Sequence, residues 1–274
     1  MVKRRWVHAA AIAVVAAIFV IPLVVLVTGS LRLPGQAPPR TLEVIPDPVT
    51  LDAWRDAFDF SPLARSMVNS LIVAAVFVPL AVLASSWAGF AIALARERLR
   101  GRLIVLALLL MMVPATALWL TRFVIFKAFG MVDTFWPLVL PALLGGSPLA
   151  VLLYAYAYGR IPGELYDASR LEGLSPVRIW WRVGMPLVRA TTVAVAMLAF
   201  LTTWANFIDP LLYLNSEDRF TAPLTLRYLE QLGPTNWPVL LAGAAAVTAP
   251  VVVVFLLAQR FFLQEERGVG WLGR

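Results

Sequence analysis

Apolar residues are concentrated in long runs along this chain, and charged residues separate each run from the next. A helix that crosses a lipid bilayer needs about 20 consecutive, mostly apolar residues. The pattern therefore predicts an all-α membrane protein with six transmembrane helices. The six predicted spans are residues 7–28, 69–95, 103–121, 134–158, 191–214 and 238–258.

The first predicted span, residues 7–28, follows the basic residues Lys3, Arg4 and Arg5, as the apolar part of a secretion signal would. It is longer than the roughly 7–15 apolar residues of such a signal, and no cleavage site of small residues ends it cleanly. We therefore expect it to remain in the protein as a membrane anchor.

The fourth predicted span differs from the others because proline and glycine interrupt it. The interruptions are Pro137, Pro141, Gly145, Gly146 and Pro148. Such residues leave backbone groups without helical partners, and in a membrane neighbouring helices or a cavity must satisfy those groups. This pattern predicts a helix packed inside a bundle rather than one that faces lipid.

The composition agrees with a membrane protein and excludes several kinds of chemistry. Of the 274 residues, 61% are hydrophobic and 14% are charged, compared with about 45–50% and about 25% in soluble domains. The sequence has no cysteine and one histidine, His8, which excludes thiolate nucleophiles and metal sites built on these residues. Neither Lys3 nor Lys127 lies in a glycine-rich phosphate-binding loop. We therefore predict no metal, no cofactor and no enzyme activity, with any ATP chemistry left to a partner.

The distribution of Lys and Arg between the predicted spans predicts the orientation of the chain. Fifteen of the 23 basic residues lie on the side of the N-terminus, and eight lie on the other side. Because cytoplasmic loops are enriched in Lys and Arg, both termini are predicted to be cytoplasmic. A net charge of +7 could also indicate nucleic-acid binding, but these basic residues are divided among short loops instead of forming one patch.

Two longer segments lie on the predicted outer side. Residues 29–65 form an extracytoplasmic loop that is rich in proline and aspartate and contains one helical stretch at residues 51–58. Residues 216–237 form a second outer loop with another short helix. Arg122 and Lys127, near the outer end of the third span, are expected to extend toward the membrane interface.

The cytoplasmic segment 160–190 has the pattern of two short helices joined by a glycine. Its apolar residues Ile161, Leu165, Ala168 and Leu171 are spaced to share one helical face, while charged residues occupy another. One interpretation is an interfacial helix that lies on lipid headgroups.

Residues at the ends of these two helices agree with this pattern. Pro162 suits the first turn of the first helix, and Gly173 can end that helix in a left-handed conformation. Ser175 and Pro176 form an N-cap and first-turn pair for a second helix. That helix is predicted to continue to Pro186 and the next span.

The order of residues in this segment resembles the EAA loop of ABC importer permeases. In that loop an acid-Ala-Ala triplet precedes an acid-Gly pair, and a hydrophobic-Pro pair closes the segment. Here the acid of the triplet is shortened to Asp, the second alanine is a serine, and Glu replaces the usual Asp before the glycine. The matching residues are Asp167, Ala168 and Ser169, then Glu172 and Gly173, then Met185 and Pro186.

Further stretches resemble the carbohydrate branch of these permeases, which includes the smaller permease subunit of the maltose-type importer. The resemblance covers about residues 66–262, while the first span and its outer loop are similar in layout only. The family pattern W-N-D-F is altered to Trp-Ala-Asn-Phe at residues 204–207, and the tail 264–274 lacks the usual small-residue ending. The matching stretches are Asn69–Val73, Gly89–Arg96, Met112–Pro114, Asp133–Pro141 and Leu256–Phe262.

The resemblance implies the MetI-like bundle of type I ABC importer permeases. On this basis, residues 1–65 form the first transmembrane helix and the extracytoplasmic loop. Residues 66–262 form a core permease domain that contains the coupling loop 160–190, and residues 263–274 form a cytoplasmic tail. The chain is expected to be a multi-pass protein of the prokaryotic cytoplasmic (inner) membrane, surrounded by lipid.

The resemblance also implies a function, which is to form half of the translocation pathway for a sugar. The implied partners are a second homologous permease, two ATP-binding-cassette ATPase subunits and an extracytoplasmic solute-binding protein, with no nucleic acid. Closure of the ATPase dimer would move the cytoplasmic helix and rock the bundle between inward-facing and outward-facing states. The residues expected to couple to the ATPase are Glu164, Leu165, Asp167, Ala168, Ser169, Leu171, Glu172 and Gly173.

Polar residues in the fifth predicted span are candidates for the sugar path, because polar groups inside a membrane are expensive and are usually functional. Asn206 and Asp209, with the aromatic residues Trp204 and Tyr213 nearby, suit a ligand rich in hydroxyl groups. The alternative is that Asn206 and Asp209 cap a helix break at Pro210 or contact the neighbouring subunit.

Other functions remain as alternatives. An ion-coupled secondary transporter needs buried ionisable residues near the midplane and often an internal repeat, but the sequence offers only Asp209, toward one end of a span. A membrane-embedded hydrolase would lack a Cys nucleophile and a second His. Among ABC permeases, a non-sugar solute such as glycerol phosphate is the alternative to a sugar.

Overall fold

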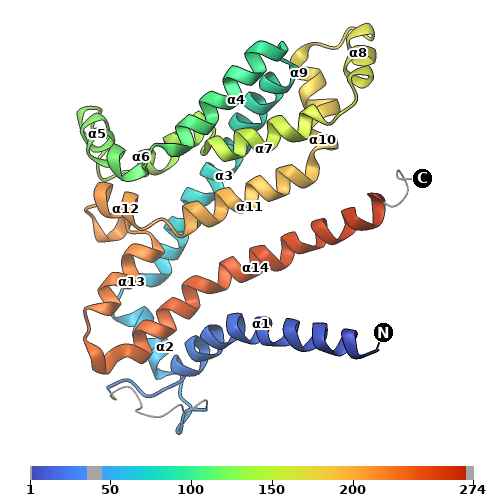
Figure 1. The fold of residues 1–274 in the computed structure, drawn as a ribbon. Coiled ribbons are helices and arrows are strands. Elements are labelled where there is room, and N and C mark those ends of the chain that lie inside the picture. The colour runs from blue at the N-terminus through green and yellow to red at the C-terminus, as the bar shows by residue number, and fades with distance from the viewer. Residues whose placement is uncertain (1, 36–44, 270–274) are drawn as a thin grey trace. The chain divides into compact units, whose positions relative to one another are not determined.

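A computed structural model describes residues 2–35 and 45–269 of the chain (Figure 1). These residues form helices joined by short connections, and none of them lies in a β-strand. The chain divides into two compact units. The first comprises residues 1–67 and 222–250, and the second comprises residues 68–221 and 251–274.

The first unit includes most of the two segments predicted to be outer loops, and the two short helices predicted in them are confirmed as α2 and α13. The end of α1 packs closely on α14, because a Cβ atom added to Gly29 would lie only 2.9 Å from the ring of Trp237. The connection to α2 is held by a hydrogen bond from Trp54 Nε1 to Ser30 Oγ, at 3.1 Å. Its elements are α1 (Val2–Gly29), α2 (Asp52–Asp59), the start of α3 (Leu63–Leu94), α13 (Ala222–Glu230), η4 (Pro234–Asn236) and the start of α14 (Trp237–Val269).

The second unit contains the predicted coupling loop and the middle spans. In Figure 1, α7 runs beside both α4 and α11, and these pairs are in contact. Its elements are the rest of α3 and α14 together with α4 (Glu97–Met112), α5 (Ala115–Ala128), α6 (Trp136–Val139), η1 (Leu140–Leu144), α7 (Pro148–Gly159), α8 (Gly163–Leu171), α9 (Pro176–Ile179), η2 (Trp180–Gly184), α10 (Met185–Leu187), α11 (Arg189–Trp204), α12 (Ile208–Tyr213) and η3 (Glu217–Arg219).

The core of this unit is built around two stacked tyrosines of α7, Tyr154 and Tyr158, whose ring centroids are 5.8 Å apart. Both side chains are fully buried, and Phe90 of α3 packs against Tyr158 edge to face. The close approach of α3 and α7 depends on Gly89. A Cβ atom at this position would lie 2.8 Å from the backbone nitrogen of Ala155, so no larger residue fits without movement of a helix.

Three of the predicted spans are confirmed as helices that are long and apolar enough to cross a membrane. They are Leu63–Leu94, Trp136–Gly159 and Trp237–Gln259. Two further pairs of helices, α4 with α5 and α9–α10 with α11, qualify only if each bent pair counts as one span. In the first predicted span, the apolar helix Val14–Gly29 is shorter than this criterion requires. The count of six therefore stays a prediction.

The third predicted span, residues 103–121, is not a single straight helix, because the chain turns sharply at Met112–Pro114, where the sequence resembles a turn of the carbohydrate permeases. The axes of α4 and α5 differ by 88°. Val113 is extended, with φ −73° and ψ 117°, and Pro114 caps the start of α5. Proline cannot donate a hydrogen bond to the preceding helix and pushes the residue before it out of the helical region. The chain consequently turns at this position.

The fifth predicted span, residues 191–214, also needs correction at both ends. The preceding segment Pro176–Leu187 meets α11 at 86°, and α11 stops at Trp204. A short break follows before α12 begins. Pro210 lies in the first turn of α12, where its missing N–H and its ring prevent a continuous helix through Asn206. The candidate polar residues therefore lie at a helix break instead of within a span.

The breaks predicted in the fourth span are confirmed. A 3₁₀ helix, η1, ends at Gly145, and both Gly145 and Gly146 are left-handed, with φ of 88° and 64°. Ser147 then caps α7 by accepting a hydrogen bond from the backbone N–H of Leu149 at 3.2 Å. Pro148 occupies the first turn. The serine cap satisfies one of the backbone groups that the interruption would leave free.

Candidate functional site

The helix–glycine–helix arrangement predicted for residues 160–190 is confirmed. Gly173 is left-handed, with φ +76°, and it forms a hydrogen bond from its N–H to the carbonyl of Arg170 at 2.9 Å. The N–H of Leu174 donates to the carbonyl of Ser169 at 3.1 Å. This pair of bonds is the Schellman motif, which closes a helix and turns the chain. A Cβ atom on Gly173 would meet nothing within 4 Å, so the backbone conformation alone favours glycine here.

Two details at the helix starts differ from the expectation. Pro162 has an extended ψ of 133° and precedes α8 as its N-cap, instead of lying in the first turn. Ser175 does occupy the N-cap position of α9, but its side chain forms no capping hydrogen bond. The second helix reaches Pro186 through a π-helical turn, η2, and a short α10.

Most of the predicted coupling residues form an open surface on α8. Leu165 and Leu171 are 45% and 90% exposed, and Ala168 is exposed as well. Asp167 lies on the polar side, where its Oδ1 is 3.0 Å from Nη1 of Arg170. On α8 the second unit thus presents a small apolar surface bordered by charge.

The face of α8 that packs on the bundle was missed by the sequence analysis, because it consists of polar residues. Tyr166 and Ser169 are the buried residues of this helix. The Tyr166 hydroxyl donates to the carbonyl of Tyr158 at 3.1 Å, and its ring lies edge to face with Phe90. Burial raises the pKa of Tyr166 to about 12. Ser169, one of the predicted coupling residues, faces the bundle and donates to the carbonyl of Leu165 at 2.7 Å.

The second half of the segment 160–190 is also bound to the bundle, through Ser86 of α3. The hydroxyls of Ser86 and Tyr158 share a hydrogen bond of 2.7 Å. Trp180 Nε1 donates to Ser86 Oγ at 3.0 Å, and Ser86 contacts the sulfur of Met185 at the same distance. Helix α8 is thus joined to the bundle by a buried hydrogen bond and η2 by a partly buried one, which gives the exposed surface of α8 a fixed base.

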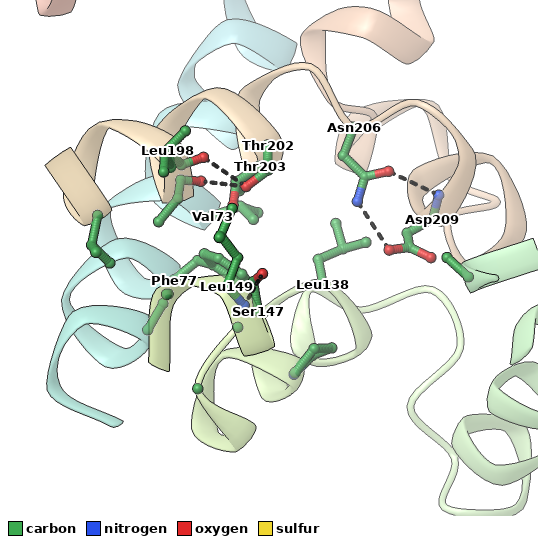
Figure 2. Close-up of a pocket in the computed structure, with 18 of the residues that line it drawn as sticks. Val73, Phe77, Leu138, Ser147, Leu149, Leu198, Thr202, Thr203, Asn206 and Asp209 are labelled. Carbon is green, nitrogen blue, oxygen red and sulfur yellow. Dashed lines mark hydrogen bonds between the residues drawn. The ribbon is translucent and has the colours of Figure 1, made fainter. Parts of the chain in front are cut away.

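The second site is a cavity of about 420 Å³ within the second unit (Figure 2). This volume lies in the usual range for small-molecule pockets. The cavity is bounded by α3, α5, the broken fourth span, α11 and the chain break before α12. Most of its lining is apolar, and the polar or charged residues among the described lining are Ser70, Arg122, Ser147, Thr202, Thr203, Asn206, Asp209 and Thr221.

Asn206 and Asp209 lie together at this cavity and bind each other in two ways (Figure 2). Asn206 Nδ2 donates to Asp209 Oδ2 at 3.0 Å, and Asn206 Oδ1 accepts from the Asp209 backbone N–H at 3.2 Å. The second bond is the helix-capping interaction that formed the alternative interpretation of these residues. Both residues also line the cavity, so capping the break and facing a solute are compatible roles.

Arg122 is paired with Asp209, which corrects the expectation that it extends to the membrane interface. Its guanidinium nitrogens lie 3.3 and 3.4 Å from the two carboxylate oxygens. Both side chains are mostly covered, at 27% and 18% exposure. An ion pair between α5 and α12 therefore forms part of the cavity lining.

The two aromatic candidates lie outside the described lining of the cavity. Tyr213 is fully buried between Phe123 and Phe126 of α5, with ring centroids 6.2 and 5.4 Å away. Trp204 is buried and stacked on Phe200. These contacts attach α12 to α5 and hold the end of α11.

A cluster of hydrogen bonds that was not identified from the sequence forms around the carboxylate of Asp133. Asp133 has a left-handed backbone, φ 59°, in the connection between α5 and α6. Its carboxylate accepts hydrogen bonds from the backbone N–H groups of Asn215 and Ser216, each at 3.0 Å, and from the Ser216 hydroxyl at 2.5 Å. It also forms an ion pair with Arg219. The hydroxyl of Ser216 is the main cause that lowers the pKa of Asp133.

Comparison with known proteins places this fold in a family. Residues 81–264 match the family described as the binding-protein-dependent transport system inner membrane component. The chain belongs to this family. It is therefore a permease subunit of an ABC importer in the cytoplasmic membrane, and the family implies a separate ATPase and a solute-binding protein. The predicted resemblance and the assignment of ATP hydrolysis to a partner are confirmed, and the secondary-transporter alternative is excluded.

Relatives align with 73% to 94% of the chain. The arabinooligosaccharides transport system permease protein AraQ of Halalkalibacterium halodurans is 32% identical over 94% of this chain and 93% of its own length. The lactose transport system permease protein LacG of Rhizobium radiobacter is 30% identical over 73% of this chain and 72% of its length. Among solved structures, a chain of a bacterial ABC transporter for import of the acidic polysaccharide alginate aligns with a TM-score of 0.78. It is 17% identical, covers 93% of this chain and 95% of its own, and supports the MetI-like fold.

Proposed function

We propose that this permease forms half of a translocation pathway for a sugar. Relatives named for arabinooligosaccharides, lactose and trehalose support this substrate class. The cavity has the matching chemistry, because hydroxyl, amide and carboxylate groups bind sugar hydroxyls while apolar side chains cover the C–H faces. In this proposal Asn206 and Asp209 face the solute. Trp204 and Tyr213 support them from outside the lining.

The exposed surface of α8 is the contact through which the ATPase acts. The observation that carries this assignment is an apolar surface, Leu165, Ala168 and Leu171, held on a base that buried hydrogen bonds attach to the bundle. A helix that merely rested on lipid would need no such attachment. A surface fixed in this way can transmit a movement of the ATPase to α3 and α7, and the charged residues Glu164, Asp167 and Glu172 border it.

The complete importer in this proposal contains one copy of this chain, a second related permease, two ATPase subunits and the solute-binding protein. In this complex the pathway lies between the two permeases, and this chain contributes half of it. Both termini are cytoplasmic, the spans number six, and the chain divides at residues 1–65, 66–262 and 263–274.

Reconstitution tests this function directly. The chain is co-expressed with the subunits encoded beside it and placed in liposomes, with ATP supplied on the side of the membrane that carries the ATPase. We expect uptake of neutral oligosaccharides that needs both ATP and the binding protein. Uptake that continues without ATP, or a complex that imports sugar phosphates and no sugar, would contradict the proposal.

A further inference from the structure

The cavity contains a balanced pair of charges. Arg122 and Asp209 are the ionisable residues in its described lining, and their charged groups are 3.3 Å apart. At this distance a guanidinium and a carboxylate compensate each other, which is how charges are usually accommodated inside a membrane protein. The described lining therefore has no net charge.

The remaining polar groups of the described lining are uncharged hydroxyl and amide groups, on Ser70, Ser147, Thr202, Thr203, Asn206 and Thr221. The Oγ1 atoms of Thr203 and Thr221 have no hydrogen-bond partner among the described residues, but protein atoms cover both. Ser147 and Thr202 are exposed residues of the lining, so a solute with hydroxyl groups can reach them.

Apolar side chains lie between the polar groups of the cavity. Figure 2 shows Phe77 and Leu149 beside Ser147, and Leu138 between them and the Asn206–Asp209 pair. A ligand that fits this lining combines uncharged polar groups with a C–H surface.

We infer that this cavity selects solutes that carry no net charge and disfavours uronates and sugar phosphates. The inference rests on the proposed transport function and narrows its substrate class. An anionic solute that took the side of the guanidinium now bound to Asp209 would leave that carboxylate without its ion-pair partner, and one that bound beside the pair would add an uncompensated negative charge to the cavity. A cationic solute that bound Asp209 would likewise leave the guanidinium of Arg122 without its ion-pair partner. A neutral polyol can accept and donate hydrogen bonds at the edges of the pair without separating it.

Cysteine labelling measures this selectivity with small charged and neutral reagents in place of the natural solute, because the chain has no cysteine of its own. Thr202 and Ser147 are exposed residues of the lining, and each is changed to cysteine in a separate variant. The complex with the second permease and the ATPase, freed of other cysteines, is placed in nanodiscs. Each thiol is then reacted with the sulfonatoethyl, trimethylammonioethyl and neutral hydroxyethyl methanethiosulfonates, which serve as small anionic, cationic and neutral solutes.

If the cavity carries no net charge, the ratio of anionic to cationic labelling rates should lie within about three-fold of the ratio for a free thiol. Asp209→Asn leaves Arg122 unpaired and should raise this ratio about ten-fold, and Arg122→Gln should lower it by a similar factor. The matched control is Lys127→Gln, which removes the same charge from α5 at a residue outside the described lining and should leave the ratio unchanged.

Three results would overturn the inference. A ratio that departs about ten-fold from that of the free thiol at both positions in the parent complex would show a charged cavity, even if the charge variants fail to assemble. If Asp209→Asn and Arg122→Gln leave the ratio of labelling rates unchanged, the ion pair does not face the solute path. The absence of labelling at both positions, with and without ATP, would show that solutes do not enter. A sugar importer with a biased ratio refutes this inference alone, whereas a neutral cavity without sugar uptake refutes the proposed function.

Discussion

At Gly173 the backbone conformation disfavours a side chain, whereas the space around the residue does not. Its φ of +76° is unfavourable for a residue with a side chain, but the space around it is open. A substitution there costs roughly 1 kcal/mol or more through the backbone alone. We expect Gly173→Val, which puts a β-branched residue in a left-handed conformation, to tilt α8 and reduce co-purification of the ATPase at least several-fold, while membrane insertion and pairing with the second permease stay normal.

Gly163 provides the matched control for this prediction. It also lies in open space, at the first residue of α8, but it has no positive φ. Valine meets no such strain here and is a better helix former than glycine, so Gly163→Val should leave ATPase association unchanged. Equal association for Gly173→Val and the parent complex would return α8 to the interpretation of a helix resting on lipid.

Asp167 tests the polar border of the same surface. Its ion pair with Arg170 is exposed on both sides, so losing it through Asp167→Ala should cost no more than about 0.2–1 kcal/mol. Asp167→Lys would place like charges together in the interface with the ATPase, which can cost several kcal/mol. We expect substrate-stimulated ATP hydrolysis in nanodiscs to fall strongly for Asp167→Lys and little for Asp167→Ala. Equal rates of ATP hydrolysis for the two variants would show that Asp167 does not lie in the interface with the ATPase.

Tyr166 is the residue through which α8 is attached to the bundle. Tyr166→Phe keeps the ring against Phe90 and removes one hydrogen bond, to the carbonyl of Tyr158, at a cost of about 0.5–1.5 kcal/mol. Tyr166→Ala also removes a buried ring, at a cost of about 3–5 kcal/mol. We expect faster amide hydrogen exchange in α8 and weak ATPase association for the alanine variant, and near-normal values for phenylalanine. Unchanged exchange in Tyr166→Ala would show that other contacts hold the helix.

At the scale of elements, the sequence allowed prediction of those features that depend on local chemistry. The left-handed Gly173, the breaks at residues 145–148 and the short outer helices follow from backbone preferences of a few neighbouring residues. The turn at Met112–Pro114 was also a local signal and part of the family resemblance, but its angle of 88° could not be predicted because hydropathy does not depend on helix direction. The pairing of Arg122 with Asp209 could not be predicted, since it joins residues 87 positions apart through packing of α5 against α12.

The connection between α5 and α6 is joined to the segment after α12 through Asp133, and this contact is sensitive to pH. The hydrogen bonds to its carboxylate lower the pKa of Asp133 in the folded protein. Their stabilising effect is therefore present above about pH 4, the pKa of an unfolded Asp, and is lost as the pH falls through the lower folded-state pKa. The contact should be intact at neutral pH and weaken only under acidic conditions.

Asp133→Asn isolates this charge, because asparagine also tolerates a left-handed backbone. The amide can still accept from backbone N–H groups, but it cannot accept at both positions or pair with Arg219. Loss of a hydrogen bond to a charged group costs about 1.5–3 kcal/mol. We expect a lower Tm for Asp133→Asn at pH 7 and a difference from the parent that shrinks as the pH falls below about 4. A constant difference across this pH range would show that the carboxylate charge does not contribute.

At the scale of the whole molecule, the orientation in the membrane decides whether the two sites lie where transport needs them. The 15 to 8 distribution of basic residues predicts that α8 faces the cytoplasm and that the loop before α2 lies outside. Because the chain has no cysteine, Pro48→Cys and Ser175→Cys create single thiols at exposed residues of these two segments. In intact cells, a membrane-impermeant maleimide should label position 48 and spare position 175, and inverted vesicles should give the reverse. Labelling of position 48 only from the cytoplasmic side would place α8 on the outer face, out of reach of any ATPase, and would refute both the topology and the coupling role.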